Sequence, residues 1–357
     1  MQGFKRVVII SDGIRGHFHQ SLGVAKWLER IAEVKQEKII TVPKLHGIRK
    51  LIVMKILARK IAARDSNYSR EWLKKSGAGI ETDFKPNTLF ISAGSSAAPF
   101  CLALAKSTGN KCAVIMTPSV IGTKPFDFAI IPEHDKHDPA DKNIITTLGA
   151  PNHIYRPELR EESHKFFADL DLTGNKKIIA LLIGGNDANY KLSPEWAEKI
   201  FTPLRDVKDS KILITTSRRS GHALDDVIEK IFRDSHNLAY MLLASRQPDI
   251  NPIPAMLGAA THVLVTEDSV SMVSESITAG FRVGLIRVPR VNNFIKNLFG
   301  FGAMRFDDLF ASMREKNLLA DLGNSPDFAE FLEYSEQKHG VNFNEAKRAA
   351  EWILSQS

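Results

Sequence analysis

The chain has 357 residues, of which 43% are hydrophobic and 25% charged, and its formal net charge is +7. This composition is ordinary for a soluble globular protein, and about 100–200 residues per domain suggests two domains. The two cysteines, Cys101 and Cys112, have no partners at zinc-ligand spacing, and no apolar run reaches the roughly 18 residues of a membrane-spanning helix. Because the apolar run 7–10 stops at Ser11, we expect no signal peptide and a cytoplasmic location.

Strands and helices are predicted to alternate along the first half of the chain. The predicted strands are 6–10, 38–42, 88–92, 112–116, 126–131 and 144–148, and the predicted helices are 17–32, 47–63, 67–76 and 96–107. Such alternation is typical of βαβ units that form a parallel sheet covered on both faces.

After a charged segment, the alternation restarts. The predicted strands are 177–183, 211–216, 237–243, 262–266 and 282–288, the helices are 194–206, 221–233, 252–260 and 270–279, and the tail 325–356 is mostly helical. We therefore expect an α/β protein with two doubly wound Rossmann-like domains that face a cleft. The expected divisions are an N-terminal domain 1–155, a linker 156–175, a C-terminal domain 176–325 and C-terminal helices 326–357.

The first strand is followed by a glycine-containing loop and then directly by a helix. Gly13 and Gly16 lie in this loop, but the segment lacks a dinucleotide fingerprint, a P-loop and a nucleophile elbow. A helix that begins after such a loop directs unpaired N–H groups at an anion. The alternative is a plain turn with a solvated histidine, His17.

The segment 44–64 carries seven basic residues and no acid, interspersed with apolar residues. A basic helix with an apolar face binds the surface of an anionic membrane. Alternatively, it packs on its own sheet and leaves its basic side in water. No aromatic platform or nucleic-acid motif accompanies the charge, so we expect no nucleic-acid partner.

Three loops of the second domain carry polar residues suited to a nucleotide. Gly184 and Gly185 allow close backbone approach, and Asn186 can bond to a phosphate or ribose. The next strand ends in hydroxyl and arginine side chains that can hold phosphate: Thr215, Thr216, Ser217, Arg218 and Arg219. Plain turns and solvated arginines are the alternatives.

The stretch "TEDSVSMVSES" supplies the third loop and the start of a helix. Its polar residues are Glu267, Asp268, Ser269, Ser271, Ser274 and Glu275. Ser269 and Ser271, with the free amides of a helix N-terminus, would seat a diphosphate, and Glu275 would accept ribose hydroxyls. The alternative is an ordinary N-cap at Asp268 or Ser269.

Together these motifs resemble the plant mitochondrial fission factor family and its bacterial relatives. The resemblance rests on Gly13-x-x-Gly16-His17, Gly184-Gly185-Asn186, Thr216-Ser217-Arg218-Arg219 and the stretch 266–272, and it covers roughly residues 6–310. That family resembles GT-B glycosyltransferases, such as the enzyme that makes lipid II. Where the lipid II enzyme has two adjacent glycines, this chain has Asp12-Gly13-Ile14-Arg15-Gly16.

The resemblance implies a nucleotide-sugar donor in the C-terminal domain and an acceptor in the N-terminal domain. Glu275 would take the ribose, while Ser271 and the Arg218 loop would take the diphosphate. Gly13, Gly16 and His17 would face the acceptor and the donor phosphates, and the C-terminal helix would cross back to the N-terminal domain.

The N-terminal loop also supplies candidate catalytic groups. His17 or His19 would act as general base on an acceptor hydroxyl, and Arg15 would neutralise diphosphate. His134, Asp135 and His137 form a further loop cluster that could ligate a metal, but we expect neither a required metal nor a cofactor.

Three functions remain open. The first is a metal-independent glycosyltransferase that uses a nucleotide-diphosphate sugar and a lipid-linked or cell-envelope acceptor, at the inner face of the cytoplasmic membrane. The second is a nucleotide-sugar 2-epimerase, which needs carboxylates near the sugar, such as Glu267 and Asp268. The third is a non-enzymatic nucleotide-binding or membrane-recruitment protein.

Overall fold

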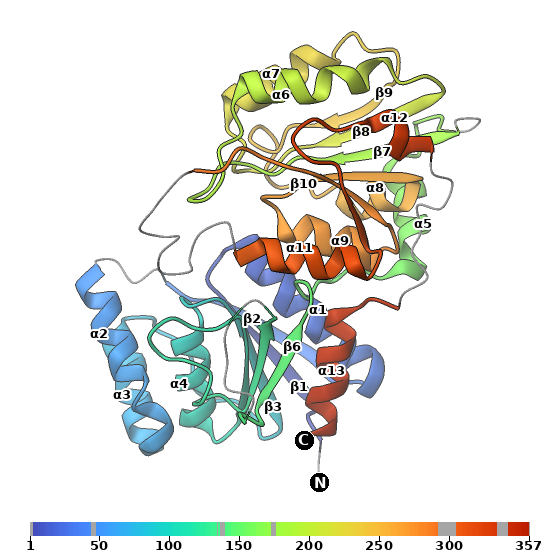
Figure 1. Cartoon of the computed structure of the whole chain (residues 1–357). Coiled ribbons are helices and arrows are strands. Elements are labelled where there is room, and N and C mark those ends of the chain that lie inside the picture. Colours follow the sequence, from blue (N-terminus) through green and yellow to red (C-terminus); the bar gives the residue numbers. More distant parts are fainter. Residues whose placement is uncertain are drawn as a thin grey trace. The chain divides into compact units, whose positions relative to one another are not determined.

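The structure is a computed structural model that describes residues 3–43, 48–133, 135, 140–172, 176–291, 305–333 and 342–356. The chain forms two compact units, each built around one parallel sheet (Figure 1). The first unit comprises residues 1–153 and 344–357, and the second comprises residues 154–343. Among the described residues, no helix is both long and apolar enough to cross a membrane.

The sheet of the first unit contains six parallel strands in the order β2-β1-β3-β4-β5-β6. They are β1 (Arg6–Ser11), β2 (Lys35–Thr41), β3 (Thr88–Ala93), β4 (Lys111–Ile115), β5 (Phe128–Pro132) and β6 (Ile144–Thr147). The central strands are continuous apolar runs because helices cover the sheet on both faces.

Two sets of helices bury the two faces of this sheet. One face packs against α1 (Arg15–Ala32) and α13 (Glu345–Ser355), through residues such as Leu28 and Ile353. The other packs against α2 (Ile48–Ala58), η1 (Ile61–Ala63), α3 (Ser66–Ser76) and α4 (Ala98–Thr108). The last helix of the chain thus belongs to the first unit and contacts α1 (Figure 1). As expected, Cys101 and Cys112 are buried free thiols.

The sheet of the second unit has the order β12-β11-β10-β7-β8-β9, again with all strands parallel. They are β7 (Lys177–Leu182), β8 (Ser210–Thr215), β9 (Leu238–Leu242), β10 (His262–Thr266), β11 (Val283–Ile286) and β12 (Leu319–Asp321). The expected α/β class with two doubly wound parallel sheets is confirmed. The strand β12 lies beyond the strands that we predicted.

The helices of the second unit follow the predicted alternation with additions. They are α5 (Arg156–Phe166), α6 (Pro194–Phe201), η2 (Thr202–Asp206), α7 (His222–Phe232), α8 (Ile253–Ala259), α9 (Val270–Thr278), α11 (Arg305–Glu315) and α12 (Phe328–Glu333). The segment 156–175 was expected to be a linker with a short helix; that helix is α5, which packs against α8 inside the second unit. We did not predict α11, which precedes β12.

The strand order determines where each sheet can bind a ligand. In the first sheet the order reverses between β1 and β3, and in the second between β7 and β10. Open parallel sheets bind ligands outside the carboxyl ends of their strands at such a switch point. The loops after β1 and β3 in one unit, and after β7 and β10 in the other, are therefore the expected ligand-binding positions.

Candidate functional site

The loop after β1 is held by its own side chains. The Gly13 N–H donates to Ser11 Oγ at 3.1 Å, and the Ile14 N–H donates to Asp12 Oδ1 at 3.1 Å. Gly13 has φ +80°, a left-handed conformation that favours glycine. Because α1 begins at Arg15, Gly16 and His17 lie in the first turn of that helix.

His17 is fixed by a carboxylate and a glycine. Its Nδ1 lies 2.9 Å from Asp12 Oδ2, and the Asp12 side chain is only 4% exposed. Burial alone would raise the pKa of Asp12, but the hydrogen bond and charge of His17 and the Ile14 N–H outweigh it, so the pKa lies below its ordinary value. The ionised carboxylate accepts the Nδ1 proton, which leaves Nε2 as the basic nitrogen of the ring.

The His17 ring also packs on the backbone of Gly94, which follows β3. A Cβ at Gly94 would lie 2.4 Å from His17 Cε1, and Gly94 has φ +79°. The loops after β1 and β3 therefore meet at the switch point of the first sheet and hold an imidazole there.

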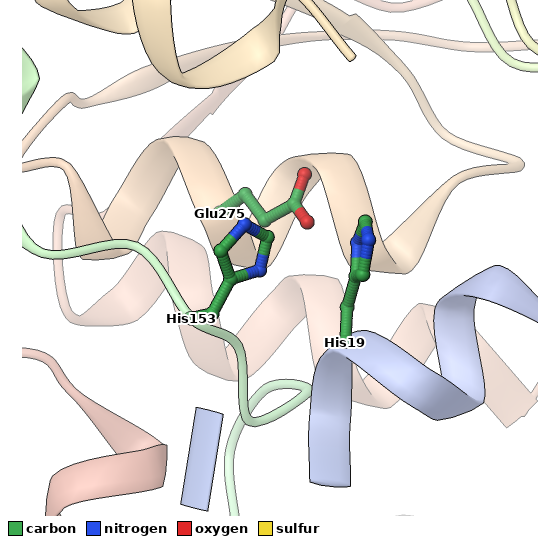
Figure 2. A group of neighbouring side chains, drawn as sticks. All are labelled: His19, His153 and Glu275. Carbon is green, nitrogen blue, oxygen red and sulfur yellow. The ribbon is translucent and has the colours of Figure 1, made fainter. Parts of the chain in front are cut away.

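His19 lies in a different environment from His17. The rings of His19 and His153 have centroids 4.6 Å apart and an interplanar angle of 64° (Figure 2). Burial and the charges of His19, Lys26 and Arg30 lower the pKa of His153 to about 3, so His153 is neutral at pH 7. Residues two apart on a helix do not share a face, so the Asp12 carboxylate orients His17 alone.

The glycine loop after β7 is joined to the loops after β8 and β10. The Gly184 N–H donates to Thr266 Oγ1 and the Gly185 N–H donates to Asp268 Oδ2, both at 2.7 Å. A Cβ at Gly184 would lie 1.9 Å from Asp268 Oδ2, and one at Gly185 would lie 2.3 Å from the Arg219 carbonyl carbon. Both glycines are required because the neighbouring loops approach the backbone so closely.

Several predicted ligand groups of these loops accept hydrogen bonds from protein N–H groups. Asn186 Oδ1 accepts from Leu192, Thr216 Oγ1 accepts from Ala244, and Ser217 Oγ accepts from Arg219. These side chains shape the loops that surround the switch point. Arg218, by contrast, is exposed.

Asp268 and Arg219 form a partly buried ion pair. Arg219 Nη2 lies 3.3 Å from Asp268 Oδ2, and its Nη1 lies 3.4 Å from Asp187 Oδ2. The Asp268 side chain is 0% exposed, and its Oδ1 has no hydrogen-bond partner among the described residues. Burial raises the pKa of Asp268 to about 6, although Thr266, the Gly185 N–H and Arg219 counteract it.

Glu267 points into an ion-pair network. Its Oε1 accepts from the Val288 N–H at 2.9 Å, and its Oε2 lies 2.7 Å from Arg287 Nη1 and 3.2 Å from Arg290 Nη2. Arg287 also pairs with Asp321, and Arg290 pairs with Asp307. The Glu267 side chain is 1% exposed, so this network engages both oxygens within the protein.

The start of α9 offers hydroxyl groups and helix amides. Ser269 is the N-cap residue but makes no side-chain capping bond, so the plain-cap alternative does not describe it. Ser271 is half-buried, while the Ser274 hydroxyl donates to the Val270 carbonyl and is turned back onto the helix. Glu275 projects from the same helix (Figure 2).

Comparison with known proteins places this chain in a family. A family model described as mitochondrial fission ELM1 matches residues 15–357. The chain belongs to the mitochondrial fission ELM1 family. This confirms the resemblance seen in its motifs. An uncharacterized protein of Rickettsia prowazekii, RP120, is 25% identical and is matched over 71% of this chain and 81% of its own length.

Solved structures share the fold of this ELM1-family chain. A putative UDP-N-acetylglucosamine 2-epimerase from Listeria monocytogenes is 12% identical, with a TM-score of 0.58 and coverage of 99% of this chain and 95% of its own. The Neisseria meningitidis UDP-GlcNAc 2-epimerase has a TM-score of 0.54 at 11% identity, with 98% of each chain covered. A UDP-glucosyltransferase from Polygonum tinctorium has a TM-score of 0.51 at 11% identity, with coverage of 100% of this chain and 99% of its own. The two units thus have the GT-B fold.

The site of the ELM1-family protein includes two residues to which the sequence analysis gave no role: Asp12 and Gly94, which hold His17. Of the two predicted phosphate-binding arginines, Arg219 forms the ion pair with Asp268. Two sequence signals could have indicated these residues: Asp12 directly follows one predicted strand, and Gly94 follows another. In the loop cluster that the sequence analysis considered as metal ligands, His134 and His137 lie outside the described residues. The Asp135 carboxylate accepts from the Thr117 N–H.

The raised pKa of Asp268 predicts a pH-dependent stability. A carboxyl with a pKa of about 6 when folded, against 3.8 ordinarily, binds its proton more tightly in the folded protein. The contribution of Asp268 to the free energy of unfolding is complete below pH 3.8 and is lost as the pH rises through about 6. Urea unfolding at several pH values in this window should show wild type losing stability relative to Asp268→Asn as the pH rises. If the free energies of unfolding of wild type and Asp268→Asn change with pH in parallel, the raised pKa of Asp268 is contradicted.

Proposed function

We propose that this ELM1-family protein is a metal-independent glycosyltransferase. Its second unit would bind a nucleotide-diphosphate sugar, and its first unit would bind the acceptor. The observation that carries the proposal is the Asp12–His17 pair, with its Nδ1–Oδ2 distance of 2.9 Å, held over Gly94 at the switch point of the first sheet. A base oriented in this way is what transfer to a hydroxyl requires.

The donor would bind at the switch point of the second sheet. The amides at the start of α9, the hydroxyls of Ser269 and Ser271, and the exposed Arg218 would hold the diphosphate. The helix N-terminus and an arginine stabilise the negative charge that develops as the diphosphate leaves, which is the task a cation performs in other enzymes. Glu275 would accept the ribose hydroxyls.

The acceptor would react through His17. As the acceptor oxygen bonds to the anomeric carbon, Nε2 takes the hydroxyl proton and the bond from that carbon to the diphosphate breaks. Structural neighbours named as UDP-sugar enzymes support uracil as the first base to test. Of the carboxylates on which the epimerase alternative depends, Glu267 is engaged by protein groups at both oxygens and Asp268 at Oδ2.

We expect donor binding to depend on the start of α9. Thermal-shift screening against UDP, GDP, CDP and CMP identifies the nucleotide, and mass spectrometry with its sugar forms then detects transfer. Ser271→Ala and Glu275→Ala should each weaken nucleotide binding by about 1–3 kcal/mol, since each removes a hydrogen bond to the ligand. Turnover without any acceptor would instead favour an epimerase.

The control for this experiment is Glu198→Ala, which removes an exposed carboxylate on α6 that pairs with Lys230. Its nucleotide affinity should equal that of wild type. If Ser271→Ala and Glu275→Ala both keep wild-type nucleotide affinity, the proposed donor site at α9 is refuted.

We also propose that α2 brings the protein to anionic membranes, where a lipid-linked acceptor is found. Three apolar side chains of this helix, Ile52, Val53 and Ile56, are 44%, 53% and 47% exposed. Arg59 and Lys60 directly after it are exposed too. Lys55 is different: it is buried and donates to Ser119 Oγ at 2.9 Å, so it faces the protein. Exposed apolar and basic residues together favour an interfacial helix.

Replacing Ile52, Val53 and Ile56 together with serine should release the protein from anionic vesicles at moderate salt, because the apolar contribution to membrane binding is lost. Sedimentation with phosphatidylglycerol-containing vesicles measures this. A matched triple serine variant of exposed isoleucines elsewhere, Ile31, Ile39 and Ile250, should sediment as wild type does. Wild-type protein that stays in the supernatant even at low salt would refute membrane binding.

A further inference from the structure

A groove of about 470 Å³ lies in the second unit, lined by α5, the end of α8 and the turns before β10 and β11. The helices α5 and α8 lie side by side (Figure 1). They approach closely because Gly258 faces the backbone of α5: a Cβ there would lie 2.0 Å from the Leu159 carbonyl oxygen. The volume falls within the range of about 300–1,000 Å³ that is typical of small-molecule sites.

One wall of the groove is basic. Arg156, Arg160 and His164 are spaced by four residues along α5, so they form one exposed stripe on the helix, and all three line the groove. None of the described lining residues is acidic. The Arg156 guanidinium rests on Gly280, where a Cβ would lie 2.2 Å from Nη2 and where φ is +100°. The glycine thus makes room for the cation beside the groove.

The rest of the lining is mainly apolar. Leu159, Phe167, Leu257 and Phe281 are each at most 6% exposed and form the buried side of the groove. Such a surface offers few partners for the hydrogen-bonding edge of a base or for the hydroxyls of a sugar. It matches a hydrocarbon chain instead, while the arginines match a phosphate or carboxylate.

We propose that this groove binds an anionic single-chain lipid, with the acyl chain on the apolar side and the headgroup on Arg156 and Arg160. The groove lies at the edge of the sheet where β7, β10 and β11 begin, since Ile178 and the turns 259–260 and 279–281 line it. The candidate donor loops follow the opposite ends of β7 and β10. A strand spans about 17–20 Å, so the two sites are separate and the lipid site does not depend on the proposed transferase activity.

The test is calorimetric titration of the full chain with dodecyl phosphate below its micelle concentration. We expect saturable binding that weakens at least tenfold in the double variant Arg156→Gln, Arg160→Gln. Dodecyl maltoside, which has the same chain without the charge, and inorganic phosphate, which has the charge without the chain, should each bind at least tenfold more weakly to wild type. A second variant, Ala260→Trp, places a bulky side chain in the groove and should also weaken binding.

The matched control is Lys165→Gln, Lys199→Gln, which removes the same charge from exposed positions outside the groove. It should bind dodecyl phosphate as wild type does. The proposal is overturned if the Arg156 and Arg160 double variant binds dodecyl phosphate as tightly as wild type does. It is also overturned if the lysine control loses as much affinity as that double variant, or if wild type does not bind dodecyl phosphate. The nucleotide-dependent thermal shift should be the same in all these variants, so a failure here is distinguishable from a failure of the transferase proposal.

Discussion

Replacing His17 with alanine is expected to lower kcat about 10²–10⁴-fold, the usual contribution of a general base, while the nucleotide-dependent thermal shift stays unchanged. The reason is the place of His17 in the first unit, whereas the proposed donor contacts belong to the second. Single-turnover measurements with the donor found by screening would separate chemistry from binding. Equal losses in binding and turnover would make His17 a phosphate contact instead.

The residues that hold His17 provide the more specific test. Asp12→Asn preserves the shape of the side chain but removes the charge that orients the Nδ1 proton. It should therefore lower kcat, because the carboxylate no longer holds the ring in the tautomer that leaves Nε2 as its basic nitrogen. Gly94→Ala should also lower kcat, since its Cβ would lie 2.4 Å from the ring.

A control histidine is available on the surface of the second unit. His236 is exposed, and His236→Ala should keep wild-type kcat. If Asp12→Asn leaves kcat unchanged, the carboxylate only fixes the loop through the Ile14 N–H, and the catalytic role of the pair is refuted.

Replacing Glu267 with alanine should destabilise the protein by about 3–5 kcal/mol, the usual cost of removing one member of a buried ion pair. The variant leaves Arg287 and Arg290 without the carboxylate that they share, and it leaves the buried Val288 N–H without its acceptor. Urea unfolding followed by circular dichroism measures the change.

Two further variants separate this network from a ligand role. Glu315→Ala removes an exposed carboxylate on α11 and should leave the stability unchanged. Glu267→Gln keeps an acceptor for Val288 and should fall between wild type and alanine. A stable Glu267→Ala variant that has lost nucleotide binding would contradict the structural role and return Glu267 to the donor site.

The apolar periodicity of the sequence was sufficient to predict the main elements. The runs 7–10 and 88–92 became β1 and β3, and the restart at 177 became β7, because strands buried on both faces need continuous apolar residues. The order of strands was not predictable in this way, because it depends on which distant segments pair. That order placed the predicted loops after β1, β7 and β10 at the two switch points.

The sequence by itself thus determined the fold class, the alternation of elements and which loops carry polar residues, because these depend on local patterns of burial and turn formation. Only the tertiary structure decided what each polar residue does. Glu267 and Asp268 are adjacent, yet one pairs with Arg287 and the other with Arg219, and His17 depends on Asp12 and Gly94. The partners are separated in sequence by as many as 77 residues, for His17 and Gly94, and a side chain's role depends on what folding brings against it.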